Sequence, residues 1–254
     1  METVHIAFLL TTLAGISTTI GGLIAYFIKK PKFSYLSFLL GFSAGVMIYV
    51  SFVELLHKSI NNMGFFSANI AFFGGIIGIY FVDKFIPHIH LDMKPDLHHR
   101  MIKHRKKLAA AGLFIAVGIA IHNFPEGMAV FAVSLESIAL GLPIAFAIAI
   151  HNIPEGIAVS VPIYYATGNR KKAFIYSSLS GITEPVGAAI GYLLLLPFLT
   201  SAILYAALAV VAGIMVFICF DELLPISREY GNEHLSTLGL FFGMVVMVLS
   251  LSIL

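Results

Sequence analysis

The chain has 254 residues, of which 59% are hydrophobic and 11% are charged, and its formal net charge is +2. Soluble domains carry about 25% charged residues, so this composition excludes a soluble globular protein and predicts an integral membrane protein surrounded by lipid. The single cysteine, Cys219, excludes a disulfide framework and a thiolate metal cluster. We also expect no nucleic-acid partner.

Eight apolar segments are long enough to cross a bilayer as helices, which takes about 20 residues each. In chain order they lie at 5–28, 33–57, 65–86, 108–131, 139–166, 172–196, 201–226 and 234–254. The first segment has neither a basic n-region nor a small-residue cleavage site, so we interpret it as a spanning helix and not as a signal peptide. The sequence therefore predicts an all-α integral membrane protein with eight transmembrane helices in a single domain over 1–254.

The second and seventh predicted helices are related in sequence. AGVMIYVSFVELL at 44–56 and AGIMVFICFDELL at 212–224 are identical at 7 of 13 positions. With eight crossings the two helices run in opposite directions, so the related segments are inverted. Inverted repeats with a site near the midplane are typical of transporters. The alternative is a chance similarity between two helices that are rich in Gly and Ala.

The connection at 87–107, PHIHLDMKPDLHHRMIKHRKK, is polar, basic and rich in histidine. In this topology it shares one side of the membrane with 14 of the 15 Lys and Arg residues, and only Lys58 lies opposite. Because basic residues concentrate on the cytoplasmic side, we predict that this loop is cytoplasmic and that both termini lie outside. Its histidines suggest metal buffering or sensing, and a basic loop against anionic lipid is an equal alternative.

The fourth and fifth predicted helices carry the same motif. IHNFPEGMAV at 121–130 returns as IHNIPEGIAV at 150–159, with 8 of 10 positions identical. Ionisable residues inside an apolar run are costly and are therefore functional candidates. Residues four apart share one face of a helix, so His122 lies beside Glu126. A short connection makes the two helices antiparallel neighbours, which brings both copies to one depth in the membrane.

Together the two copies supply imidazole, carboxylate and amide ligands. They are His122, Asn123, Glu126, His151, Asn152 and Glu155. Imidazole with carboxylate suits zinc, and the mixture of nitrogen and oxygen also suits ferrous iron, manganese or cobalt. Glu184, in TEPVG of the sixth helix, is a further candidate ligand. The alternative is a buried polar network that clamps helices, but a clamp does not require the same six-residue pattern twice.

Other ionisable residues near the ends of helices suggest a route to and from this centre. The candidates for an outer entrance are Glu54 and His57. The candidates for an inner exit are Asp83, His88, His90, Asp221 and Glu222. Each of these, taken singly, is equally well explained as a solvated helix end.

The paired HNxPEG motifs resemble those of the ZIP (Zrt/Irt-like) metal transporters, especially the bacterial ZupT-like branch. The resemblance runs from end to end and includes GFSAGVMIYVSFVELL, FVDKFIPHIH, SGITEPVGAAIG and AGIMVFICFDELLP. It implies an eight-helix fold in which helices 1–3 and 6–8 form inverted repeats around a central pair, helices 4 and 5. It also implies a homodimer.

The resemblance further implies a binuclear metal site between helices 4 and 5. One position would be formed by His122, Glu126, His151 and Glu155. The other would be formed by Asn123, Asn152, the same two glutamates and Glu184.

We therefore predict a transporter that takes up divalent metal cations into the cytoplasm. Zinc and iron are the expected substrates, with manganese, cobalt and cadmium as further ones, and the metals are cargo, not catalytic cofactors. Short loops and the lack of a transit peptide favour a bacterial inner membrane, with periplasmic or extracellular termini. The rivals are an exporter on the same path, a receptor without transport, and an intramembrane metalloenzyme. The enzyme would need a metal-bound water and a general base, and the HExxH pattern is absent.

Overall fold

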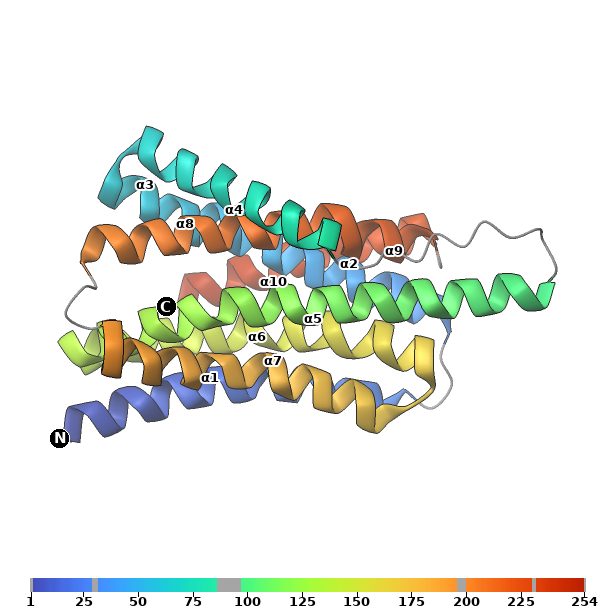
Figure 1. The fold of residues 1–254 in the computed structure, drawn as a ribbon, viewed down its shortest axis with the longest axis horizontal. Helices are drawn as coiled ribbons and strands as arrows, with labels where there is room; N and C mark the ends of the chain where they lie inside the picture. The colour runs from blue at the N-terminus through green and yellow to red at the C-terminus, as the bar shows by residue number, and fades with distance from the viewer. Residues whose placement is uncertain (1, 29–31, 86–96, 196–199, 230–231, 254) are drawn as a thin grey trace.

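A computed structural model of the chain describes residues 2–28, 32–85, 97–195, 200–229 and 232–253, and they are helical almost throughout (Figure 1). The α-helices are α1 Glu2–Phe27, α2 Phe33–Val50, α3 His57–Met63, α4 Phe65–Phe85, α5 Leu97–Glu136, α6 Ile138–Thr167, α7 Arg170–Ile190, α8 Ser201–Ile218, α9 Leu224–Glu229 and α10 Glu233–Ile253. Three π-helical segments interrupt them, η1 Ser51–Leu56, η2 Gly191–Leu195 and η4 Cys219–Leu223. No β-strand occurs in these ranges.

The described helices join into eight rods, because α2, η1 and α3 are continuous, as are α7 with η2 and α8, η4 with α9. Seven rods contain segments long and apolar enough to cross a membrane. They are Glu2–Ile24, Phe33–Met63, Phe65–Val82, Leu108–Leu135, Gly141–Thr167, Ser201–Glu229 and Glu233–Ser252. The all-helical membrane architecture is thus confirmed. The remaining rod, α7, begins with RKK and carries Glu184 among several hydroxyl side chains, so its crossing stays a prediction.

One predicted loop is partly helical. Residues 97–107 belong to α5, which begins at Leu97 and extends well beyond the other helices (Figure 1), whereas the sequence predicted a loop over 87–107. This stretch contains no Gly or Pro, and Leu, Met, Lys and Arg favour helix, so α5 continues as a polar helix. Residues 86–96, and with them His88 and His90, lie outside the described ranges.

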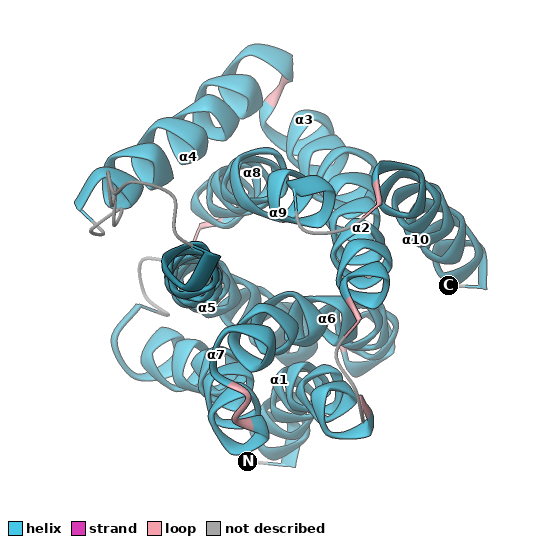
Figure 2. Ribbon diagram, turned by 90° about the vertical axis from the view of Figure 1, so that its right-hand side faces the viewer, coloured by secondary structure: helices cyan, strands magenta, loops and turns pink. Residues whose placement is uncertain are grey.

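The rods divide into two groups when the bundle is seen end-on (Figure 2). In the first group α1 packs against α6 and α7, and α5 packs against the same two helices. In the second group α2 packs against α10, and α4 packs against α8. The groups meet where α2 contacts α6 and where α5 contacts α8. The paired motifs on α5 and α6 therefore lie in a four-helix unit with α1 and α7.

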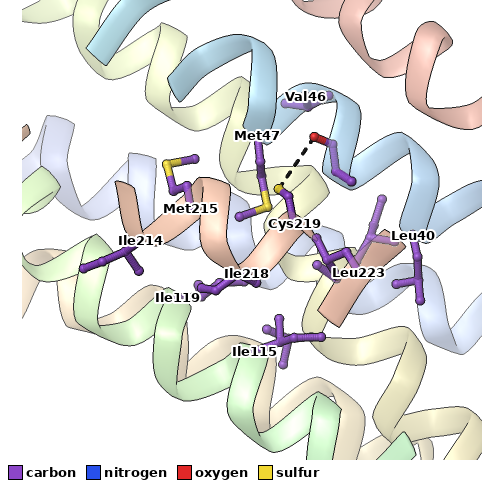
Figure 3. Packing of buried hydrophobic residues seen from close by; sticks show 14 of the residues in the cluster. Leu40, Val46, Met47, Ile115, Ile119, Ile214, Met215, Ile218, Cys219 and Leu223 are labelled. Atoms are coloured by element: carbon purple, nitrogen blue, oxygen red, sulfur yellow. Dashed lines mark hydrogen bonds between the residues drawn. The ribbon is translucent and has the colours of Figure 1, made fainter. Parts of the chain in front are cut away.

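An apolar seam joins the two groups (Figure 3). Ile119 of α5, Ile218 of α8 and Met47 of α2 are all fully buried there. Cys219 is buried in the same seam, with its Sγ 3.7 Å from the carbonyl oxygen of Ala44. In lipid such a seam is held by van der Waals packing, because lipid tails are as apolar as the side chains.

Equivalent glycines make equivalent contacts in the two related helices. A Cβ atom on Gly45 of α2 would overlap the carbonyl oxygen of Leu240 on α10. A Cβ atom on Gly213 of α8 would overlap the carbonyl oxygen of Phe72 on α4. The two glycines are 168 positions apart in the sequence, because 213 − 45 = 168, and the two residues that they meet are also 168 positions apart, because 240 − 72 = 168. The pair α2–α10 and the pair α8–α4 are therefore packed in the same register.

The same two helices share a rare local feature. The π-helical segments η1, SFVELL, and η4, CFDEL, begin at aligned positions of the 44–56 and 212–224 segments. Single π-turns inside α-helices are uncommon and often occur at functional sites. They place Glu54 in η1 and Glu222 in η4, so both acidic residues lie in locally widened helix turns.

Candidate metal centre

The paired motifs meet near the middle of α5 and α6, which pack against one another. One ligand atom each from His122, Glu126 and Glu155 lies within 4.8 Å of the other two. All three side chains are fully buried. Within the part of the chain that the structure describes, they form the one group of three or more ionisable side chains with the spacing of a metal site.

Each histidine of the pair interacts with the glutamate of the opposite helix. The distance from His122 Nε2 to Glu155 Oε1 is 3.0 Å, and that from His151 Nε2 to Glu126 Oε2 is 3.5 Å. His151, which is also fully buried, thus joins the cluster through Glu126. The histidine and the glutamate of each motif therefore lie on the face that meets the other helix, where each contacts its counterpart of opposite type.

The two asparagines attach this pair to the flanking helices. Asn123 Nδ2 donates to the carbonyl oxygen of Ser180 on α7 at 3.2 Å. Asn152 Nδ2 donates to the carbonyl oxygen of Ala14 on α1 at 2.9 Å and also to Glu184 Oε1. Each amide nitrogen is used for anchoring, so each amide oxygen remains available as a ligand. Glu184 is brought to the same site, as the sequence predicted.

The glycine that ends each motif lets a third helix approach closely. A Cβ atom on Gly127 would overlap the carbonyl oxygen of Glu184, and one on Gly156 would overlap the carbonyl oxygen of Thr18. Small residues allow helix backbones to approach this closely in membranes. The contact at Gly127 holds α7 against α5 at the level of the paired glutamates, and this positions Glu184.

The polar atoms of the centre fit a divalent cation. Every predicted ligand has one buried polar atom without a hydrogen-bond partner among the described residues: His122 Nδ1, Asn123 Oδ1, Glu126 Oε1, His151 Nδ1, Asn152 Oδ1, Glu155 Oε2 and Glu184 Oε2. An unpaired buried polar group costs about 1–3 kcal/mol, and a cluster of them is explained if a cation can coordinate them. Imidazole nitrogen with carboxylate and amide oxygen is a donor set that suits zinc and similar borderline ions.

The predicted outer entrance lines a cavity. Glu54 and His57, together with Lys58, line a space of about 350 Å³ between the second rod, α6 and α10. Glu54 is buried, and its Oε1 atom accepts a hydrogen bond from Lys58 Nζ at 3.0 Å, whereas Oε2 has no partner in the described structure. Ala147 of α6 also lines the cavity, and it lies one helix turn before His151. The cavity therefore reaches the helix that carries the second motif.

The structure describes the side chains of only two of the predicted exit residues. Asp221 is exposed and Glu222 is partly buried in η4. Asp83 lies on α4, but its side chain, like His88 and His90, is outside the described structure. The exit route thus stays a prediction.

The sequence analysis missed Lys58, the partner of Glu54 at the entrance, and two partners of the centre, the carbonyl groups of Ala14 and Ser180. Lys58 had a signal, because it follows Glu54 by four residues on one helix. The carbonyl groups have no side-chain signal. However, AGI at 14–16 recurs as SGI at 180–182, and this recurrence relates α1 to α7.

The sequence is similar over its whole length to known proteins. Residues 92–251 match the family described as ZIP Zinc transporter. The chain is 51% identical to the zinc transporter ZupT of Chlorobium phaeovibrioides, and 50% identical to that of Oceanobacillus iheyensis, over the full length of all three chains. It is 48% identical to the zinc transporter ZupT of Campylobacter jejuni, over 100% of this chain and 98% of that one.

Proposed function

Because the chain belongs to the ZIP family of zinc transporters, we propose that it carries zinc ions across a membrane through the buried centre between α5 and α6. The observation that carries this proposal is the fully buried cluster of His122, Glu126 and Glu155. His151 joins this cluster through its interaction with Glu126. The protein is a transporter and not an enzyme, and zinc is its cargo, not a catalytic cofactor.

The centre holds two cations in this proposal. The first is coordinated by the histidines and glutamates, which are His122, Glu126, His151 and Glu155. The second is coordinated by the asparagine oxygens and by carboxylates, which are Asn123, Asn152, Glu126, Glu155 and Glu184. The support is that every one of these side chains has an unpaired buried polar atom. Because such mixed sites do not discriminate strongly, ferrous iron, manganese, cobalt and cadmium are further substrates.

The route runs from the outer cavity to the cytoplasm. Glu54 and His57 receive the cation, the buried centre strips its water, and Asp83, His88, His90, Asp221 and Glu222 guide its release. Uptake is favoured because 14 of the 15 basic residues face the release side, which we take as cytoplasmic. This orientation places both termini outside a bacterial inner membrane. A homodimer is part of the same proposal.

The test is zinc flux into proteoliposomes that contain a zinc-sensitive dye. We expect Glu126→Ala with Glu155→Ala to abolish zinc entry while the protein stays folded, because both cation positions lose their shared ligands. The matched control is Glu2→Ala with Glu233→Ala, two exposed glutamates near helix starts, which should leave the flux unchanged. Equal flux in the site variant and the native protein would make the motif a structural clamp. Absence of flux in both would overturn the proposed zinc transport through this centre.

A further inference from the structure

Helix α1 carries a buried hydroxyl group without a partner at the level of the centre. Thr18 is fully buried, and its Oγ1 atom has no hydrogen-bond partner in the described residues. A threonine in a helix usually donates to the carbonyl oxygen four residues earlier, as buried Thr11 does to Ala7 at 3.0 Å. For Thr18 that carbonyl belongs to Ala14, and it already accepts hydrogen bonds from Ser17 Oγ and from Asn152 Nδ2.

The internal symmetry of the bundle makes Thr18 the counterpart of Glu184. Asn152 donates to the carbonyl group of Ala14 on α1, and Asn123 donates to that of Ser180 on α7. The two acceptors are therefore equivalent residues of the two helices, 166 positions apart in the sequence, because 180 − 14 = 166. The same offset leads from Thr18 to Glu184, since 18 + 166 = 184. The motif glycines agree, because Gly156 meets the carbonyl of Thr18 and Gly127 meets the carbonyl of Glu184.

The side-chain positions follow the same relation. A Cβ atom on Gly15 would lie 3.3 Å from the Cβ of Glu184, and a Cβ atom on Gly181 would lie 3.0 Å from the Cβ of Thr18. Thr18 and Glu184 thus leave their helices in equivalent directions, on opposite sides of the asparagine pair. Glu184 reaches across to Asn152 on α6. The symmetry directs Thr18 toward Asn123 on α5, but its side chain is shorter and makes no direct hydrogen bond there.

We propose that the Thr18 hydroxyl holds a water molecule of the cation that is coordinated by Asn123, Asn152 and Glu184, which makes Thr18 a positioning residue. The inference rests on the proposed function. The threonine side chain is shorter than that of glutamate, and one water molecule can span the difference. A hydroxyl group can both donate a hydrogen bond to this water and accept one from it. A water ligand in place of a further carboxylate also keeps the negative charge of the centre lower, which favours release of the cation.

A structural role for Thr18 makes the opposite prediction about stability. If its hydroxyl group only helped to hold the helices together, Thr18→Val would lower the melting temperature of the protein. If the hydroxyl group has a hydrogen-bond partner only when the hydrated cation is bound, its replacement by a methyl group of similar size removes an unpaired polar group from the metal-free protein. The metal-free protein would then melt at the same or a higher temperature.

The experiment is zinc chloride titration of the purified full-length protein in detergent, with melting curves in chelator and in zinc. For Thr18→Val we expect one of the two zinc-binding steps to lose about 10-fold or more in affinity, without loss of stability in chelator. Thr18→Ser should restore the native affinity. The matched control is Thr11→Val, which removes a hydroxyl group that is already paired within α1, so zinc affinity should not change.

Two results would overturn the inference. Native zinc affinities in Thr18→Val, or a lower melting temperature of this variant in chelator, would show that the hydroxyl group does not serve the cation. Either result would leave the proposed function intact, because the native protein would still bind zinc. Absence of zinc binding in the native protein would instead overturn the proposed function together with this inference.

Discussion

At the scale of single residues, the centre is defined by polar atoms whose partners are incomplete. His122 and Glu155 use one atom each for their mutual interaction at 3.0 Å, and each keeps a second atom unpaired. A structural clamp would be expected to pair these atoms, because an unpaired group inside the membrane costs free energy that a second hydrogen bond would recover. The half-paired arrangement is therefore evidence for a ligand and against a clamp.

Lys58 is predicted to compete with the incoming cation at the entrance. Its ammonium group lies 3.0 Å from Glu54 Oε1, so a divalent cation that binds this oxygen must displace it, and one that binds Oε2 meets its positive charge nearby. Such a pair is worth up to about 1 kcal/mol when one partner is exposed, and the Lys58 side chain is 45% exposed. Lys58→Met should therefore lower KM for zinc by about two- to fivefold in proteoliposome flux at low salt.

The control for this variant is Lys171→Met, an exposed basic residue at the other end of the bundle, which should leave KM unchanged. The effect of Lys58→Met should also shrink at high salt, because salt screens exposed charges. An unchanged or higher KM in Lys58→Met would remove Lys58 and Glu54 from the entry route.

At the scale of the elements, close helix contacts depend on individual glycines. A Cβ atom on Gly45 would overlap the backbone of α10, whereas one on Gly74 of α4 would meet nothing within 4 Å. We therefore predict that Gly45→Ala costs about 1–3 kcal/mol. Gly74→Ala should be neutral or should stabilise the protein by about 0.5–1 kcal/mol, because Ala favours helix more than Gly.

Melting temperatures of the two variants in detergent check this prediction. Gly213→Ala serves as an internal comparison, because its contact with α4 has the same register as that of Gly45 with α10. It should destabilise the protein to a similar extent. Equal melting temperatures of Gly45→Ala and Gly74→Ala would contradict the packing described for α2 and α10.

At the scale of the whole molecule, the packing predicts which parts move. The centre lies in the group formed by α1, α5, α6 and α7, and this group meets the other mainly through an apolar seam. Among the described residues this seam is largely apolar, and one hydrogen bond that crosses it runs from Ser43 Oγ on α2 to the carbonyl oxygen of Pro154 on α6 at 2.8 Å. An interface held mostly by apolar packing slides more readily than one held by many hydrogen bonds. Transport should therefore require displacement of one group relative to the other.

Crosslinking tests this movement in a Cys219→Ala background. A short bifunctional thiol reagent should stop zinc flux in Gly118→Cys with Ile218→Cys, a pair in direct contact across the seam between α5 and α8. It should leave flux largely intact in Phe42→Cys with Phe242→Cys, whose native rings lie 5.9 Å apart within one group. Single-cysteine variants treated with the same reagent are the controls. Equal inhibition of both pairs would place the movement elsewhere.

Much of this could be predicted from the sequence because a bilayer imposes strong demands. Spanning helices must be long and apolar, so seven of the eight predicted segments are recognisable by composition alone. Against that background the ionisable residues of the two HNxPEG motifs stand out, and the structure brings His122, Glu126 and Glu155 together. Segment 97–107 was predicted wrongly, because polarity alone does not separate a loop from a helix that extends beyond the membrane.

Sequence patterns did not show which helices touch. Gly41 and Gly45 have the same spacing as Gly74 and Gly78, but only the first pair contacts another helix in the described structure. The membrane crossing, the paired motif and its ligand types were thus determined by the sequence itself, because each depends on nearby residues and on the cost of polar groups in lipid. The crossed histidine–glutamate pairs, the place of Thr18 opposite Glu184 and the two-group architecture were decided by tertiary structure, because they depend on close approach between helices that are distant in the chain.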